Sequence, residues 1–186
     1  MPLSQSELET IRRNAIMLHG PEAVDRALDQ MAAEISALLA DKLPVVLCIL
    51  TGGIIPTGHL LTRLPFPLEI DYLHATRYRR QTSGADIQWV CRPDISLQGR
   101  SVLVIDDILD EGHTLAGVLD FCRESGAAAI YSAVLIDKRH DRRIEGIKAD
   151  FYGLEVADHY VFGFGMDYKG YLRNLNGIFT LGPEKG

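Results

Sequence analysis

Cysteine is scarce in this chain of 186 residues, which contains only three. Cys48, Cys91 and Cys122 lie far apart, form no Cys-x-x-Cys pair and have no histidine at a spacing suited to metal binding. This pattern predicts neither a disulfide framework nor a zinc site. We interpret the three residues as reduced thiols of a cytoplasmic protein.

Long apolar runs and an excess of basic residues are also missing. No apolar stretch approaches the roughly 20 residues that a membrane-spanning helix needs, and the N-terminus has no basic segment followed by an apolar one. The chain has 19 Lys and Arg against 25 Asp and Glu, a formal charge of −6. Because proteins bind nucleic acid by neutralising its phosphates, this balance argues against a general nucleic-acid partner, but it leaves room for a local basic site. We expect a soluble protein that does not contact membranes.

What the chain does have is material for a packed core. Hydrophobic residues make up 47% of the sequence, which excludes the disordered and fibrous classes. Apolar residues recur at three- and four-residue steps after Pro21 and predict a helix over 22–41. Short apolar runs bounded by turn residues predict strands at 45–50, 68–75, 87–91, 102–105 and 128–136. Amphipathic segments between strands predict helices at 55–64 and 115–123.

Strands that alternate with helices predict an α/β fold with a mostly parallel sheet flanked by helices. We find no internal repeat or linker, so we expect a single domain over residues 1–186. A polar, turn-rich segment at 77–86 interrupts the pattern between two strands. It is either a solvated hairpin loop or a lid, and a loop of this length in a compact domain favours the lid.

The most informative stretch is VLVIDDILDEGHTL, residues 102–115. A β-branched strand ends in Asp106 and Asp107, the chain turns through 110–114, and an apolar-periodic helix follows. Ligands of open parallel sheets bind at the carboxyl ends of the strands, where a turn into a helix offers free N–H groups to a phosphate. The stretch therefore predicts a phosphate-binding turn.

The side chains of this stretch fit the same ligand. Gly112 allows close approach of the backbone, Thr114 adds a hydroxyl, and the paired carboxylates suit a diol or a hydrated magnesium ion. One alternative is that Asp110 and Thr114 merely cap the helix. Another is a phospho-acceptor domain, in which Lys138 would pair with a phosphoaspartate. The phosphate-sized turn argues against both.

These residues resemble a known family. The run from Val104 to Thr114 is similar to the phosphoribosyl-pyrophosphate signature of type I phosphoribosyltransferases. Further segments resemble the branch that acts on hypoxanthine and guanine, and they are LTGG at 50–53, LIDKR at 135–139, DFYG at 150–153, and YVFGFGMDY at 160–168 with Arg173. The likeness covers about residues 45–173.

The resemblance implies a type I phosphoribosyltransferase fold with two N-terminal helices and a small hood, formed by the N-terminal region and about 150–186. The implied reaction is purine salvage. The 5-phosphoribosyl group of phosphoribosyl pyrophosphate (PRPP) passes to hypoxanthine or guanine with Mg²⁺ as cofactor, giving IMP or GMP and pyrophosphate. The family also implies a cytoplasmic homodimer or homotetramer whose partners are these small molecules.

The resemblance further implies a role for each matching residue. Asp110 would be the acid or base at purine N7. The ribose and Mg²⁺ would be held by Asp106 and Asp107. The 5′-phosphate would bind the turn made by Asp110, Glu111, Gly112, His113 and Thr114. Pyrophosphate would contact Thr51, Gly52, Gly53 and Arg173, next to a cis peptide between Leu50 and Thr51. The purine would meet Lys138 at its 6-oxo group, Tyr160, Val161 and Asp167, the last also near a second Mg²⁺. The lid would include Arg77 and Tyr78.

Some positions depart from the family pattern. Glu111 stands where many members have a small hydroxyl residue, and a phosphate 4 Å away would repel it by about 1 kcal/mol in water, so we expect its side chain to point away. Thr51 replaces a lysine of some members, and Arg77 replaces a serine. His113 adds a side chain that titrates near neutrality.

A second hypothesis is a nucleotide-sensing regulator of the same fold that binds RNA. Its basic face would come from Arg77, Arg79, Arg80, Lys138, Arg139, Arg142 and Arg143. The acidic net charge makes it the weaker hypothesis.

Overall fold

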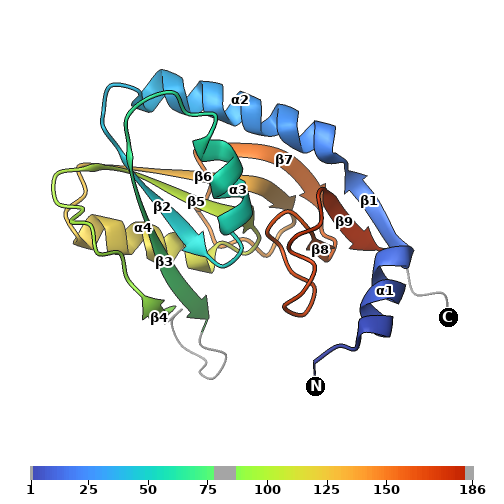
Figure 1. Ribbon diagram of the computed structural model, residues 1–186. Coiled ribbons are helices and arrows are strands. Elements are labelled where there is room, and N and C mark those ends of the chain that lie inside the picture. Colours follow the sequence, from blue (N-terminus) through green and yellow to red (C-terminus); the bar gives the residue numbers. More distant parts are fainter. Residues whose placement is uncertain (1, 78–86, 183–186) are drawn as a thin grey trace.

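The computed structural model describes residues 2–77 and 87–182, which form two sheets and four helices (Figure 1). The larger sheet has six strands in the order β4-β3-β2-β5-β6-β7. Their bounds are β2 Val45–Leu50, β3 Glu69–Arg77, β4 Ile87–Cys91, β5 Ser101–Leu109, β6 Ala129–Arg139 and β7 Phe151–Ala157. All neighbours pair in parallel except β3 and β4. The expected α/β fold with a mostly parallel sheet is confirmed.

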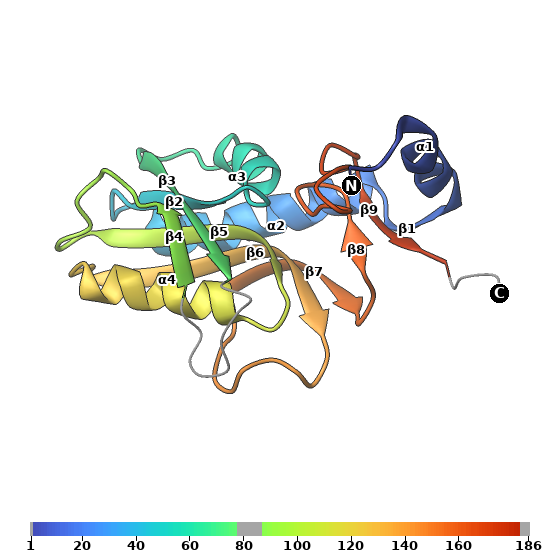
Figure 2. The same ribbon diagram turned by 90° about the horizontal axis from the view of Figure 1, so that it is seen from below.

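Helices cover both faces of this sheet, so β2 is apolar along its whole length and β5 is apolar from Val102 to Ile105. Helices α2 (Pro21–Leu39) and α3 (Ile54–Leu61) lie on one face, and α4 (His113–Glu124) lies on the other (Figure 2). Helix α2 follows Gly20, has Pro21 in its first turn, and buries one stripe at three- and four-residue steps. That stripe is Val24, Ala27, Leu28, Met31, Ala32, Ile35 and Leu39. None of the helices in the described part of the chain has the length and hydropathy of a membrane span.

The smaller sheet joins the two ends of the chain. It contains β1 (Ala15–His19), β9 (Ile178–Leu181) and β8 (Val161–Phe162), with β9 in the middle and both pairings antiparallel. Helix α1 (Gln5–Asn14) precedes it, capped by Ser4 and Glu7 in a capping box, and buries none of its residues. The two N-terminal helices are thus present, with a strand between them that the sequence analysis did not predict.

Most predicted elements match the structure, and two boundaries differ in ways that matter. Strand β5 runs to Leu109 rather than ending at residue 105, because Ile108 and Leu109 stay paired with β6. Asp106 and Asp107 therefore belong to the strand instead of following it. Most of the expected lid, including Tyr78, lies outside the described residues, and Arg77 is the last residue of β3.

Candidate functional site

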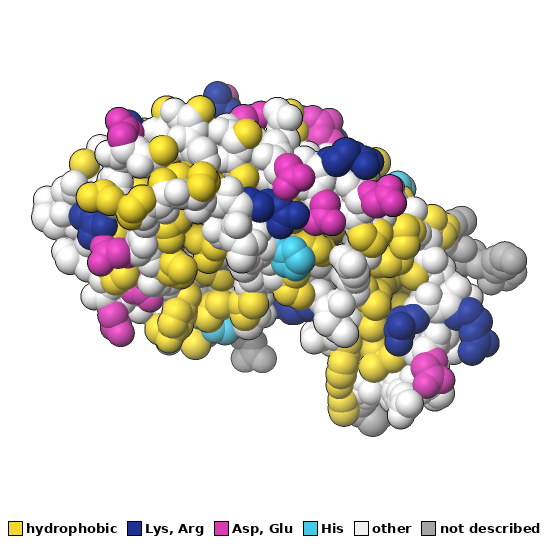
Figure 3. Space-filling view, turned by 45° about the horizontal axis from the view of Figure 1, so that its top comes forward, with side chains coloured by type: hydrophobic (Ala, Val, Ile, Leu, Met, Phe, Trp, Pro, Cys, Tyr) yellow, Lys and Arg dark blue, Asp and Glu magenta, His cyan; other side chains and the backbone are white. Residues whose placement is uncertain are grey.

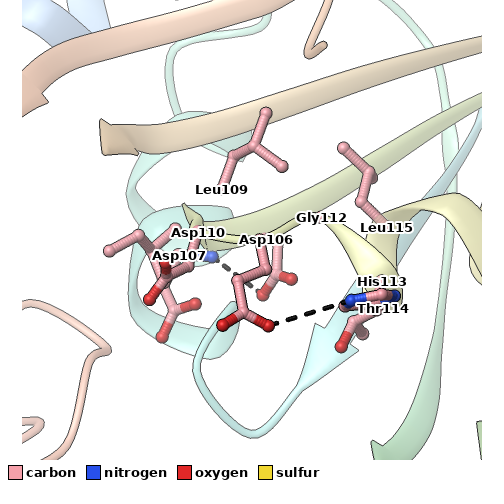
Figure 4. Close-up of a pocket in the computed structure, with 10 residues that line it drawn as sticks. Asp106, Asp107, Leu109, Asp110, Gly112, His113, Thr114 and Leu115 are labelled. Atoms are coloured by element: carbon pink, nitrogen blue, oxygen red, sulfur yellow. Dashed lines mark hydrogen bonds and ion pairs between the residues drawn. The ribbon is translucent and has the colours of Figure 1, made fainter. Parts of the chain in front are cut away.

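A cavity of about 380 Å³ opens at the carboxyl ends of β2, β5 and β6. It brings together eleven residues that the sequence analysis assigned to a site, and they are Thr51, Gly52, Asp106, Asp107, Asp110, Thr114, Lys138, Tyr160, Val161, Asp167 and Arg173. A second cavity of about 290 Å³ adjoins it along residues 106–115 and adds Glu111, Gly112 and His113 (Figure 4). Gly53 is buried and lines neither cavity.

The predicted phosphate turn contains a glycine that no other residue can replace without strain. Gly112 has a φ of 91°, and a Cβ there would lie 2.5 Å from Cγ2 of Ile147. Helix α4 begins directly after it, so His113 and Thr114 belong to the first turn of the helix rather than to the loop before it (Figure 4). Gly112 provides no side-chain cap for the helix. The first N–H groups of α4 therefore receive no hydrogen bond from a cap side chain, and such groups suit an anion.

Glu111 and His113 lie side by side at the edge of this turn. Oε2 of Glu111 is 3.8 Å from Nε2 of His113, and both side chains are about one-third exposed, at 35% and 32%. Both residues line the second cavity. The two side chains are therefore close enough to interact at the edge of the phosphate turn.

The Asp106 and Asp107 carboxylates form the acidic wall of the larger cavity. Burial raises the pKa of both carboxyls, and the charge of Asp107 raises that of Asp106 further. Arg173 provides a nearby cation, with Nη1 3.8 Å from Oδ2 of Asp107. The described residues contain no cluster of three or more acidic, histidine or cysteine ligands. Two adjacent, electrostatically strained carboxylates fit Mg²⁺, which proteins commonly hold through one or two carboxylates together with substrate phosphates.

The segment after β2 packs against this wall. The Leu50–Thr51 peptide is cis, as the family resemblance implied. A Cβ on Gly52 would lie 1.9 Å from Oδ2 of Asp107, and one on Gly53 would lie 2.6 Å from the Ile49 carbonyl oxygen. Both glycines are therefore required by close packing.

The loop between β8 and β9 closes the opposite side of the cavity. Arg173 Nη2 lies 2.7 Å from Oδ1 of Asp167, and its Nη1 donates to the carbonyl of Gly165. A Cβ on Gly165 would lie 2.3 Å from the Gly52 carbonyl oxygen, so the loop touches the segment after β2. The ring of Tyr160 remains 56% exposed at the cavity while its hydroxyl donates to the Asp167 carbonyl. An exposed, tethered aromatic ring suits stacking against a planar ligand.

The Asp110 carboxylate contacts two side chains, those of Lys138 and His140. Lys138 Nζ lies 2.9 Å from its Oδ2, and His140 Nε2 lies 2.6 Å from its Oδ1. Burial raises the pKa of Asp110, but Lys138 and His140 outweigh this effect and leave the pKa below its usual range. Lys138 is buried. It contacts Asp110 rather than Asp106 or Asp107, which does not fit the arrangement of a phospho-acceptor domain.

The sequence analysis missed three residues of the β6–β7 and β7–β8 connections that complete this site. The first is His140, whose side chain is only 2% exposed. The second is Asp158, which pairs with Arg142 at 2.6 and 2.8 Å, and this pairing lowers the pKa of Asp158 to about 2. The third is Arg143, which donates to the carbonyls of Leu109, Asp110 and Lys138 and to the buried Asp137 carboxylate. Their sequence carries no motif, and only tertiary contacts identify them.

Known proteins with similar sequences and structures agree with this geometry. Residues 17–169 match the family model for the phosphoribosyl transferase domain. The hypoxanthine-guanine phosphoribosyltransferase of Bacillus subtilis is 32% identical over 168 residues, covering 90% of this chain and 93% of the relative. The hypoxanthine-guanine-xanthine phosphoribosyltransferase of Tritrichomonas foetus is 30% identical over 159 residues, covering 86% and 87%. A crystal structure of a hypoxanthine phosphoribosyltransferase from Staphylococcus aureus superposes with a TM-score of 0.88 at 27% identity, covering 94% of this chain and 96% of the other. With its phosphate turn, acidic wall and buried lysine in the matching fold, the chain belongs to the phosphoribosyltransferase family, among the hypoxanthine-guanine phosphoribosyltransferases.

Proposed function

We propose that this protein is a purine-salvage enzyme that transfers the 5-phosphoribosyl group of PRPP to hypoxanthine or guanine, giving IMP or GMP and pyrophosphate. The observation that carries the proposal is the meeting of a phosphate turn, two strained carboxylates and the Asp110–Lys138 pair around one cavity. Those three features match the three parts of a nucleoside monophosphate: phosphate, ribose and base.

The phosphoribosyl end of the substrate would bind along β5 and α4. The N–H groups of 110–114 and the Thr114 hydroxyl would hold the 5′-phosphate, supported by the free first turn of α4. Asp106 and Asp107 would accept hydrogen bonds from the ribose hydroxyls. Gly52, Thr51 and Arg173 would face the pyrophosphate.

Magnesium is the proposed cofactor. Asp106 and Asp107 would hold one ion together with substrate oxygens, and Asp167 would help hold a second. When bound, Mg²⁺ supplies positive charge that offsets the negative charge on the departing pyrophosphate. The two carboxylates themselves would also stabilise the positive charge that develops on the ribose ring.

The purine would lie between Tyr160 and Lys138. Lys138 would donate to the 6-oxo group, which favours 6-oxopurines over adenine, because the exocyclic amine of adenine offers a cation no good acceptor. In the reaction the bond between C1′ and the pyrophosphate oxygen breaks, a bond forms between C1′ and the purine nitrogen, and Asp110 accepts the proton released at N7. A carboxylate kept ionised by Lys138 and His140 suits this role as a base.

The RNA-binding alternative has no comparable support. Four of its basic residues are engaged by carboxylates, because Lys138 pairs with Asp110, Arg139 with Glu155, Arg142 with Asp158 and Arg143 with Asp137. On the face shown in Figure 3, acidic and basic side chains are interspersed over α2 and form no continuous basic surface. Arg79 and Arg80 lie outside the described residues.

We propose three further properties of the whole molecule. We propose that the small sheet and α1 act as the hood of a single domain, since the loop between β8 and β9 closes the cavity. A homodimer or homotetramer, as the family resemblance implied, is checked by light scattering. A cytoplasmic location is in keeping with the three free cysteines.

The test is consumption of purine with PRPP and Mg²⁺, run in parallel with hypoxanthine, guanine, xanthine, adenine and uracil. We expect turnover of hypoxanthine or guanine and none of adenine or uracil. Asp110→Asn is the matched inactive variant, because it keeps the shape of the side chain and removes the base. Failure of every 6-oxopurine to react would refute the proposal.

A further inference from the structure

Five residues form a closed circuit of polar contacts, and one of them is Asp110, the proposed catalytic base. Lys138 Nζ lies 2.9 Å from Oδ2 of Asp110 and 3.9 Å from Oδ1 of Asp158. Asp158 accepts two hydrogen bonds from the guanidinium of Arg142. The backbone N–H of Arg142 donates to Nδ1 of His140 over 3.1 Å. Nε2 of His140 lies 2.6 Å from Oδ1 of Asp110, which completes the circuit.

These contacts fix the tautomer of His140. Its Nδ1 accepts a hydrogen bond from a backbone N–H, so this nitrogen carries a lone pair and the ring proton resides on Nε2. Nε2–H therefore donates to Oδ1 of Asp110. Because the His140 side chain is only 2% exposed, water does not compete for this hydrogen bond.

The other partner of Asp110 is shared with the substrate in the proposed reaction. Lys138 donates to Oδ2 of Asp110 in this structure, and the proposed function requires the same ammonium group at the 6-oxo group of the purine. A lysine that serves both groups holds the carboxylate less firmly. The hydrogen bond from His140 is the contact of Asp110 that the purine does not share.

We propose that His140 is a positioning residue, which holds the Asp110 carboxylate toward purine N7 while Lys138 binds the 6-oxo group of the purine. The inference rests on the proposed function, because that function assigns Asp110 and Lys138 to the purine. His140 itself does not line either cavity, so it acts through Asp110 and not by touching substrate. Its loss should therefore affect turnover and leave PRPP binding unchanged.

Several charged groups face Asp110 and have to be held constant in any test. Lys138 contacts it from β6. Asp158 lies 3.9 Å from Lys138, and Arg142 pairs with Asp158. Arg143 reaches only the Asp110 backbone carbonyl, over 3.3 Å. Variants of His140 leave all of these residues unchanged.

Three substitutions separate the two hydrogen bonds of His140. His140→Gln places an amide N–H near the position of Nε2 and keeps the donor to Asp110. His140→Asn places a carbonyl oxygen near the position of Nδ1, which keeps the contact with the Arg142 N–H and loses the donor to Asp110. His140→Phe keeps the ring and loses both.

The measurements are kcat and KM for PRPP and for hypoxanthine, together with the acid limb of the pH–rate profile. We expect kcat to fall about 10- to 100-fold in His140→Asn and His140→Phe, part of the 10²–10⁴-fold that acid–base catalysis contributes. KM for PRPP should stay within about twofold, and His140→Gln should recover most of kcat. The acid limb should shift to higher pH in the Asn and Phe variants, because Asp110 loses a donor that favours its ionised form.

A merely structural role predicts the opposite order. If His140 only holds its loop, His140→Asn retains kcat and His140→Gln does not, and that result would overturn the inference. Failure of the proposed function is distinguishable, because the unmodified protein would then turn over no purine at all. In that case ¹⁵N NMR of the His140 ring decides: an Nε2–H tautomer hydrogen-bonded to Asp110 supports the positioning contact, and an Nδ1–H tautomer refutes it.

Discussion

Gly52 and Asp107 pack so closely that a Cβ atom on the glycine would lie 1.9 Å from Oδ2 of the aspartate. Gly52→Ala therefore has to displace a buried carboxylate of the acidic wall, at a cost of about 1–3 kcal/mol. We expect KM for PRPP to rise about 10-fold or more, measured by steady-state kinetics with PRPP varied at saturating hypoxanthine.

Gly58→Ala is the matched control for this substitution. Gly58 lies inside α3, and a Cβ there would meet no atom within 4 Å. Alanine should stabilise the helix by about 0.5–1 kcal/mol and leave KM for PRPP unchanged. Equal kinetic effects of the two alanines would contradict the role assigned to close packing at Gly52.

Lys138→Ala should weaken purine binding much more than PRPP binding. The substitution removes the proposed donor to the 6-oxo group, and a hydrogen bond from a charged group contributes about 1.5–3 kcal/mol, so KM for hypoxanthine should rise at least about 10-fold. Lys42→Ala, an exposed lysine beside Asp41, should change neither KM. A parallel rise of both KM values in Lys138→Ala would remove this lysine from the base-binding role.

Arg143→Met should destabilise the fold more than any exposed arginine variant. Arg143 is only 17% exposed and pairs with Asp137, whose side chain is 8% exposed, so its loss leaves a buried carboxylate with fewer donors. The expected loss is about 3–5 kcal/mol in the free energy of unfolding. Arg123→Met, which breaks an exposed pair with Asp120, should cost at most about 1 kcal/mol. Urea denaturation of both variants tests the difference, and similar midpoints would count against the prediction.

The Asp106 carboxyl should make stability fall as pH rises. Burial and the charge of Asp107 raise its pKa in the folded state, so the unfolded chain releases the proton first, near its ordinary pKa of about 4. Below that pH the Asp106 carboxyl is protonated in both the folded and the unfolded state, so folding buries no charge at this position. Above the raised pKa the folded state bears the full penalty of the buried charge.

Asp106→Asn removes this charge and can keep the hydrogen bond that Oδ1 accepts from the Asp107 N–H. We therefore expect the variant to have a higher Tm than the unmodified protein at pH 8 without Mg²⁺, and the difference should shrink toward pH 4. Calorimetry across this range measures it. A difference that grows as the pH falls would have the wrong sign.

Five of the six strands of the main sheet, and the helices that flank it, could be predicted because each carries a local signal, but β7 was missed. β2 is six apolar residues between turns, and α2 has an unbroken apolar stripe after Pro21. The end of β5 was misjudged because two aspartates interrupt an apolar pattern that resumes at Ile108. Burial and pairing with β6 override the polar side chains there.

The small sheet and part of the site could not be predicted from local patterns. β8 has only two residues, and β1 and β9 are short strands that pair across almost the whole chain, so no window of sequence contains the partners together. His140 and Arg143 lie in a polar, charged segment that reads as an ordinary loop. Their importance depends on contacts with Asp110 and Leu109, about thirty positions earlier.

The pairing of β1 with β9 also has a consequence for biosynthesis. Among the described strands β1 is made first and β9 last, so β1 has to remain without this partner until Ile178–Leu181 has been made. The larger sheet needs neither strand and is free to assemble earlier. The larger sheet, which carries the acidic wall of the cavity, can thus fold before the small sheet forms. A chain stalled before Ile178 would have the first sheet without the second.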